Sequence, residues 1–130
     1  FEGEGQRDDA SIAAVVEALK FQGSVGRSAI EKRARGLANY FVAELGKLNG
    51  VKFWTHTDPE RHAAIVIFQP GSLDPRKLVA ALSEKEKIVV TGRNSAQDRP
   101  GLRLAPHFYN TMDDMERTVG AIKKYLASGV

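Results

Sequence analysis

The segment 102–111 carries the strongest chemical signal of this sequence; it reads Leu-Arg-Leu-Ala-Pro-His-Phe-Tyr-Asn-Thr. Arg103 stands between two leucines, and the alternation of a strand sends the leucines to the core and the arginine to the opposite face. A planar guanidinium offers paired donors that match the two oxygens of a carboxylate. Arg103 is therefore a candidate carboxylate clamp, with an ordinary surface arginine as the alternative. His107 follows Pro106 in a predicted turn, where it either meets a ligand in a cleft or has a structural role.

A second polar segment, Gly5-Gln6-Arg7-Asp8, comes just before a predicted helix. Backbone N–H groups are free at the start of a helix, and the amide of Gln6 and the guanidinium of Arg7 lie beside them. Such a segment can contact a phosphate group. Taken alone, a structural role is the simpler interpretation of these residues.

Several kinds of chemistry are excluded or disfavoured by the residue types. The chain has no cysteine, so disulfides, thiolate catalysis and cysteine-ligated metals are excluded. His56 and His62 flank the Asp58-Pro59 turn and could meet across it, but zinc needs three or four ligands and the spacing places no other. We therefore expect no metal site. Motifs for phosphate loops, dinucleotides and hydrolase serines are also missing.

Composition predicts one ordinary globular domain. The 130 residues are 42% hydrophobic and 27% charged, and the net charge of +3 is too small to indicate nucleic acid. The basic run 32–35 lies in a helical pattern and is interpreted as a solvated face, with an RNA or phosphate contact as the weaker alternative. No apolar run is long enough to predict a membrane span, no signal peptide is evident, and a cytoplasmic location is expected. Because the chain does not begin with Met, we expect it to come from a longer protein.

The spacing of apolar residues and the capping residues of helices predict the helices and strands that position these side chains. A first helix begins at Asp8 or Asp9 and loosens near residue 24, between two glycines. A longer helix follows and is predicted to end at Asn49-Gly50. A third helix begins at Asp74-Pro75, and a last one begins with a capping box at Thr111 and Asp114. Strands are predicted at 51–55, 63–68, 88–90 and 102–105, with a polar loop at 92–101.

The resulting order, ααββαββα, predicts an α/β fold of the α+β, two-layer kind. We expect a small, mostly antiparallel sheet with helices on one face, and one domain over residues 1–130. Such a fold also suits a free-standing ligand-binding or subunit-pairing module. In that alternative, Arg93, Arg99 and Arg103 would bind a carboxylate or phosphate regulator.

Three motifs in order resemble the C-terminal part of class V aminotransferases, fold-type I enzymes that use pyridoxal 5'-phosphate, and most of all their isopenicillin N epimerase-like branch. The motifs are Gly-Gln-Arg-Asp-Asp-Ala at 5–10, Ile-Glu-Lys-Arg-Ala-Arg-Gly-Leu-Ala at 30–38 and Arg-Leu-Ala-Pro-His-Phe-Tyr-Asn-Thr at 103–111. The resemblance extends over essentially the whole chain.

The resemblance implies roles for particular residues. Arg103 would bind the substrate α-carboxylate, and His107 would lie near the substrate entrance. Gly5 and Gln6 would approach the cofactor phosphate, although many members have Thr where this chain has Gln6. Tyr109, Asn110 and Thr111 would form the turn and cap that orient Arg103.

The resemblance also implies what surrounds this domain. The large domain, with the lysine that holds the cofactor as a Schiff base, is not part of the 130 residues. The chain alone is therefore expected to be inactive and to bind no cofactor. The intact enzyme would be a homodimer acting on an amino acid, by transamination, epimerisation or C–S bond cleavage as in cysteine desulfurases. No membrane or nucleic-acid partner is expected.

Overall fold

The structure is a computed structural model that describes residues 8–93 and 99–130. Gly5 and Gln6, the predicted phosphate contacts, lie outside the described residues. Within the described part, no helix is both long and apolar enough to cross a membrane.

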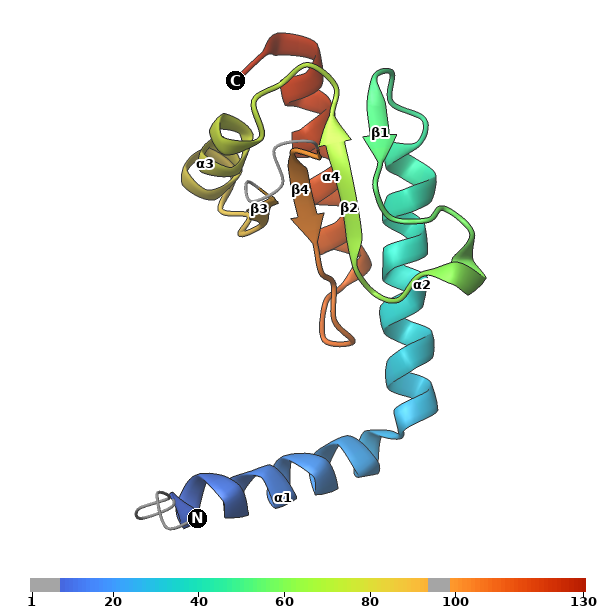
Figure 1. Cartoon of the computed structure of the whole chain (residues 1–130), viewed down its shortest axis with the longest axis vertical. Coiled ribbons are helices and arrows are strands. Elements are labelled where there is room, and N and C mark those ends of the chain that lie inside the picture. The colour runs from blue at the N-terminus through green and yellow to red at the C-terminus, as the bar shows by residue number, and fades with distance from the viewer. Residues whose placement is uncertain (1–7, 94–98) are drawn as a thin grey trace, which may run out of the picture.

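One antiparallel sheet forms the centre of the domain (Figure 1). Its strands lie in the order β1-β2-β4-β3, so that β2 and β4 are the central pair. The pairing of β2 with β4 joins residues far apart in the sequence and places Ile67 opposite Arg103. The strands are β1 Val51–Phe53, β2 Val66–Pro70, β3 Thr91–Arg93 and β4 Gly101–Leu104.

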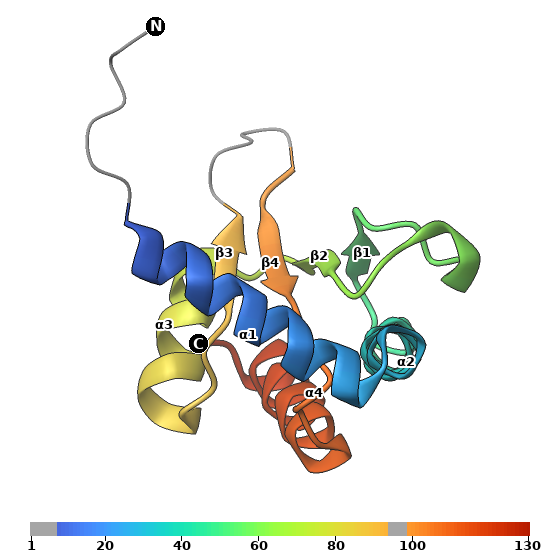
Figure 2. The same cartoon turned by 90° about the horizontal axis from the view of Figure 1, so that it is seen from below.

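Three helices cover one face of this sheet and leave the other face open (Figure 2). They are α2 Arg27–Leu45, α3 Pro75–Glu86 and α4 Met112–Ser128. A single 3-10 turn, η1 Pro59–Arg61, lies between β1 and β2. The element order and the two-layer architecture confirm the predicted α+β fold.

The core lies between the sheet and these three helices, because the two central strands turn buried residues toward the helices and accessible ones away from them. On β2, Val66 and Phe68 are fully buried while Ile67 between them is only half-buried. The same alternation on β4 buries Leu102 and Leu104 and exposes Arg103. The helices complete the core with Leu37, Phe41, Leu45, Leu78, Leu82, Met115, Ile122 and Tyr125.

Helix α1, Asp9–Val25, stands apart from the sheet and makes its main contact with α2 (Figure 1). Gly26 joins the two helices with φ of 93°, a left-handed conformation that favours glycine. The predicted helix is therefore confirmed, but its apolar face has no cover within the described residues. The large exposed apolar side chains of α1 are Ile12, Val15, Val16, Leu19, Phe21 and Val25.

Several element boundaries differ from the sequence prediction: β1 ends at Phe53 rather than at residue 55, and β2 spans Val66–Pro70 rather than 63–68. The apolar segment 88–90 is not a strand; the ladder with β4 is formed three residues later, at Thr91–Arg93. The side chain of Val89 is 89% exposed, so apolar β-propensity was overridden by the position of the partner strand. Likewise α2 ends at Leu45, four residues before the predicted stop at Asn49, because the chain turns at Gly46.

Candidate functional site

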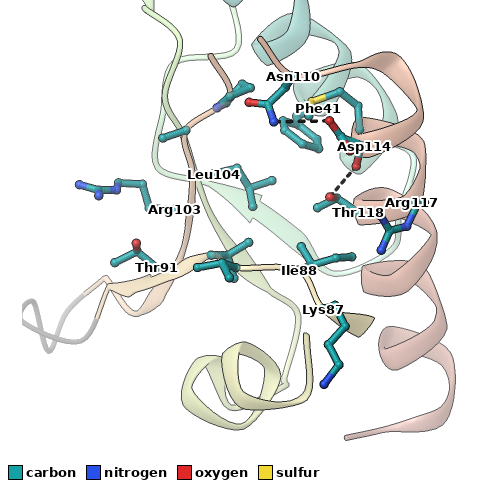
Figure 3. A pocket seen from close by; sticks show the side chains of 15 residues that line it. Phe41, Lys87, Ile88, Thr91, Arg103, Leu104, Asn110, Asp114, Arg117 and Thr118 are labelled. Atoms are coloured by element: carbon teal, nitrogen blue, oxygen red, sulfur yellow. Dashed lines mark hydrogen bonds between the residues drawn. The ribbon is translucent and has the colours of Figure 1, made fainter. Parts of the chain in front are cut away.

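Arg103 projects from the middle of the open face of the sheet. It lies on the central strand β4, opposite Ile67 of β2 and Thr91 of β3. Figure 3 shows the side chains of Arg103 and Thr91 on the side of the sheet away from α4. Strand pairing on both sides holds the backbone of Arg103, while its side chain is exposed to any group that approaches the open face.

The open face is positively charged. The four strands carry Lys52, Arg93 and Arg103 but no Asp or Glu. Among the described residues, the side chains of Arg93 and Arg103 take part in no ion pair or hydrogen bond. Two guanidinium groups on one face without a carboxylate can attract an anion.

The turn that follows β4 is organised around Asn110. Its side-chain Oδ1 accepts a hydrogen bond from the backbone N–H of His107 at 2.9 Å. Its own backbone N–H donates to the carbonyl of His107, also at 2.9 Å. From α2, Arg33 donates from Nη2 to the carbonyl of Asn110 at 2.9 Å. These contacts fix the direction in which the chain leaves β4.

The imidazole of His107 is exposed at this turn. Its ring centroid is 4.8 Å from that of Phe108 and 5.0 Å from that of Tyr109. Burial alternates along the chain from Leu102 to His107, so His107 and Arg103 both belong to the accessible set. The structure thus places the imidazole within an aromatic turn that is open to solvent.

A capping box starts α4 directly after this turn, as predicted. The Thr111 hydroxyl accepts from the backbone N–H of Asp114 at 3.2 Å, and the Asp114 carboxylate accepts from the backbone N–H of Thr111 at 2.9 Å. The backbone N–H of Thr111, and then its hydroxyl, lower the pKa of Asp114 below its ordinary value of 3.8. Asn110 and Thr111 therefore serve as turn and cap.

A pocket of about 290 Å³ lies on the other side of β4, next to the helices (Figure 3). Residues 103–106 form one wall, and the segment 87–91 and the first half of α4 form the others. The side chain of Arg103 extends away from this pocket. Arg103 is thus one of the residues that line the pocket, but its guanidinium points to the opposite side of β4. The apolar lining of the pocket includes Phe41, Ile88, Leu104 and Met115.

The other predicted candidates have local structural partners. His56 Nδ1 accepts from the backbone N–H of Asp58 at 3.0 Å, and Nδ1 of the buried His62 lies 2.8 Å from the carbonyl of Ala63. Across residues 8–93 and 99–130, no group of three His, Cys, Asp or Glu side chains could hold a metal ion.

The basic run 32–35 contributes more than a solvated face. Arg33 anchors the turn at Asn110, and Arg35 donates to the carbonyl of Pro59 at 2.7 Å. Both arginines fasten loops to α2, which no local pattern in the run indicated. Sequence reasoning missed this role because the partners lie far away in the chain.

Trp54 is a second residue that the sequence analysis missed. Its indole Nε1 donates to the carbonyl of Pro100 at 3.0 Å, and the ammonium of Lys52 lies 4.6 Å from the ring centroid. Trp54 thereby ties the end of β1 to the segment just before β4. A lone tryptophan beside a strand is the one sequence signal that could have drawn attention to it.

Solved structures of cysteine desulfurases share this fold. Cysteine desulfurase CsdA from Escherichia coli superposes with a TM-score of 0.83, at 20% identity, over 98% of this chain and 33% of that chain. The apo cysteine desulfurase from Thermococcus onnurineus gives a TM-score of 0.76, at 20% identity, over 84% of this chain and 29% of that chain. These likenesses establish the fold.

The sequence comparisons establish the family. Residues 4–118 match the family described as "Aminotransferase class-V", and the chain belongs to this family. Isopenicillin N epimerase of Amycolatopsis lactamdurans is 32% identical over 124 residues, which make up 95% of this chain and 31% of that protein. The isopenicillin N epimerase of Streptomyces clavuligerus is 30% identical over 124 residues, 93% of this chain and 30% of that protein. The chain thus spans about a third of the length of these curated relatives.

Proposed function

We propose that this chain is the small C-terminal domain of a pyridoxal-phosphate enzyme that acts on an amino acid, and that Arg103 binds the substrate carboxylate. Family membership supports the class of enzyme. The observation that carries the role of Arg103 is its place on a central strand, exposed on a positively charged face without a carboxylate partner in the described structure.

The geometry suits a carboxylate clamp for a physical reason. A strand held by neighbours on both sides keeps the Cα of Arg103 in place, and the turn at Asn110 is held to α2 by Arg33. From this fixed backbone position the planar guanidinium can form two parallel hydrogen bonds to one carboxylate. Arg103 would therefore set the orientation of the substrate Cα.

The described residues do not enclose the cofactor by themselves. A lysine that holds pyridoxal phosphate needs a desolvated, pre-organised pocket, yet every lysine of this chain is exposed. Class V enzymes depend on this cofactor, which stabilises negative charge developing at Cα. We propose that another domain of the longer enzyme holds it, that Gly5 and Gln6 approach its phosphate, and that the isolated chain is inactive. The intact enzyme would be a homodimer.

This domain itself supplies no thiolate that could accept sulfur. A desulfurase that takes sulfur onto itself needs a thiolate acceptor, and none of the 130 residues supplies one. The similarity to two isopenicillin N epimerases favours proton transfer at Cα over sulfur transfer on this domain. Transamination and epimerisation share the clamp and differ in steps that this domain does not perform.

The test compares substrates with and without the carboxylate in the longer enzyme. Arg103→Gln should lower kcat/KM for the amino acid about 100-fold, because a charge-assisted bidentate contact is lost, but leave the corresponding amine nearly unchanged. Lys52→Gln, which removes a charge from the same face, is the matched control and should have little effect. Equal losses for amino acid and amine would refute the clamp. Lysine-bound cofactor absorbance in the purified 130-residue chain would refute its predicted inability to hold the cofactor.

A further inference from the structure

We propose that Arg93 forms a second anion subsite beside Arg103, so that the favoured substrates are amino acids whose side chain carries another carboxylate. This inference rests on the proposed function, because it assigns the α-carboxylate to Arg103. It starts from the register of β3 and β4. Thr91 pairs with Arg103, and Arg93 pairs with Gly101.

Strand geometry places both guanidinium groups on one face. Residues directly opposite each other share a face, and so do residues two apart on one strand. Arg93 therefore projects to the same side as Thr91 and Arg103, the open side seen in Figure 3. Arg93 and Arg103 are diagonal neighbours, a relation in which positions lie roughly 7–8 Å apart.

Gly101, opposite Arg93, adds no side chain to the surface between the two arginines. A Cβ at this position would lie 2.4 Å from the carbonyl oxygen of Phe68, so no side chain can stand there. The short hydroxyl side chain of Thr91 is the nearest neighbour on the other side of the diagonal. Gly101 is itself buried, so the accessible surface between Arg93 and Arg103 lies on the side of Thr91, which is exposed and carries only a short side chain. A ligand chain can cross there.

The charge balance indicates the chemistry of this ligand. Neither guanidinium has a carboxylate partner in the described structure, and no Asp or Glu stands on the four strands. Two neighbouring positive charges repel each other, and a dianion relieves this repulsion at both positions. The two acid groups of an extended dicarboxylic amino acid are separated by a distance similar to that between the two arginine positions. The flexible arginine side chains adapt to the remaining difference in distance.

The first experiment measures binding to the 130-residue chain with glutarate and butyrate as probes, followed by NMR at the arginine side chains. Glutarate should bind about fivefold more tightly than butyrate, a ratio set by one further exposed ion contact. Arg93→Gln should abolish this ratio, Arg93→Lys should keep part of it, and Lys52→Gln should keep it fully. Each variant is checked for an unchanged amide spectrum.

Equal binding of the two probes to the unmodified chain would overturn the proposal. So would an equal loss of preference in Arg93→Gln and Lys52→Gln, because that result is a general charge effect. The second experiment measures kcat/KM of the longer enzyme for L-glutamate against L-glutamine, and Arg93→Gln should reduce the ratio about fivefold. If the longer enzyme acts on amino acids but shows no preference for L-glutamate over L-glutamine, the result contradicts the subsite and leaves the carboxylate clamp intact. Inactivity on every amino acid would contradict the proposed function, while the probe binding still decides the subsite.

Discussion

Arg33 on α2 donates a hydrogen bond from Nη2 to the backbone carbonyl of Asn110, 2.9 Å away and 77 residues further along the chain. Asn110 in turn holds the backbone of His107, three residues after the end of β4. The contact thus joins the longest helix of the domain to the turn that follows the strand of Arg103. It explains why a helix-surface arginine matters to the candidate site.

Replacing Arg33 tests this contact. Arg33→Ala should lower the free energy of unfolding by about 1 kcal/mol, the usual net value of one hydrogen bond. Urea denaturation of the purified chain measures the change. Lys32→Ala removes the neighbouring charge and, because no hydrogen bond of Lys32 is seen in the described structure, should change stability much less. Equal effects of the two substitutions would contradict a specific role for Arg33.

The cap of α4 should contribute measurable stability. Thr111→Ala removes the hydroxyl that accepts from the N–H of Asp114 and should cost about 1 kcal/mol at neutral pH. Thr111→Ser keeps the hydroxyl and should restore most of the loss. Thermal unfolding of both variants measures the difference, and a Ser variant as unstable as the Ala variant would argue against the cap.

Acid should weaken the same cap through Asp114. The pKa of this carboxylate is lowered in the folded state, first of all by the backbone N–H of Thr111. The stability that the Asp114 carboxylate adds is therefore fully present above the ordinary pKa of 3.8. This stability is lost as the pH falls through the lower pKa of the folded state. The Asn side chain of Asp114→Asn does not titrate. The difference in free energy of unfolding between this variant and the unmodified chain should therefore shrink on acidification below about pH 4. A difference that stays constant from pH 7 to pH 2 would contradict this assignment.

Gly101 should be intolerant of any side chain. The Cβ of Gly101→Ala would meet the carbonyl oxygen of Phe68 at 2.4 Å, and the central strands would have to separate. We expect a loss of about 1–3 kcal/mol. Gly120→Ala is the matched control, because Gly120 lies in α4 with nothing within 4 Å of the added carbon. That control should stabilise the domain by about 0.5–1 kcal/mol. Chemical denaturation measures the free energy of unfolding of both variants. A Gly101→Ala variant of normal stability would show that the strands can adjust.

The apolar face of α1 should make the isolated chain self-associate. Ile12, Val15, Val16 and Leu19 repeat at helical spacing, and all four are exposed. Leu19→Gln should reduce association in sedimentation experiments, while Ala13→Gln, on the side of the helix that carries Glu17 and Lys20, should not. A chain that stays monomeric at high concentration would show that this face needs no cover.

Local sequence patterns determined much of this domain. The caps at Asp74 and Thr111, the helical spacing before Leu45 and the alternation around Arg103 act between residues that are close in the chain. Short-range hydrogen bonds and periodic burial are encoded locally, so the element order and the side of the sheet on which Arg103 lies could be predicted.

Tertiary structure alone decided the remaining features. The position of β3 depended on where β4 offered hydrogen-bonding partners, and the pairing of Arg93 with Gly101 depended on the register of these strands. The hydrogen bond of Arg33 depended on a carbonyl 77 residues away in the chain. Such contacts join distant segments, and their energies depend on the geometry of the partner rather than on local residue preference. That is why Arg103 could be singled out in the sequence as a candidate, while the neighbours that pair with its strand and share its face could be found only in the fold.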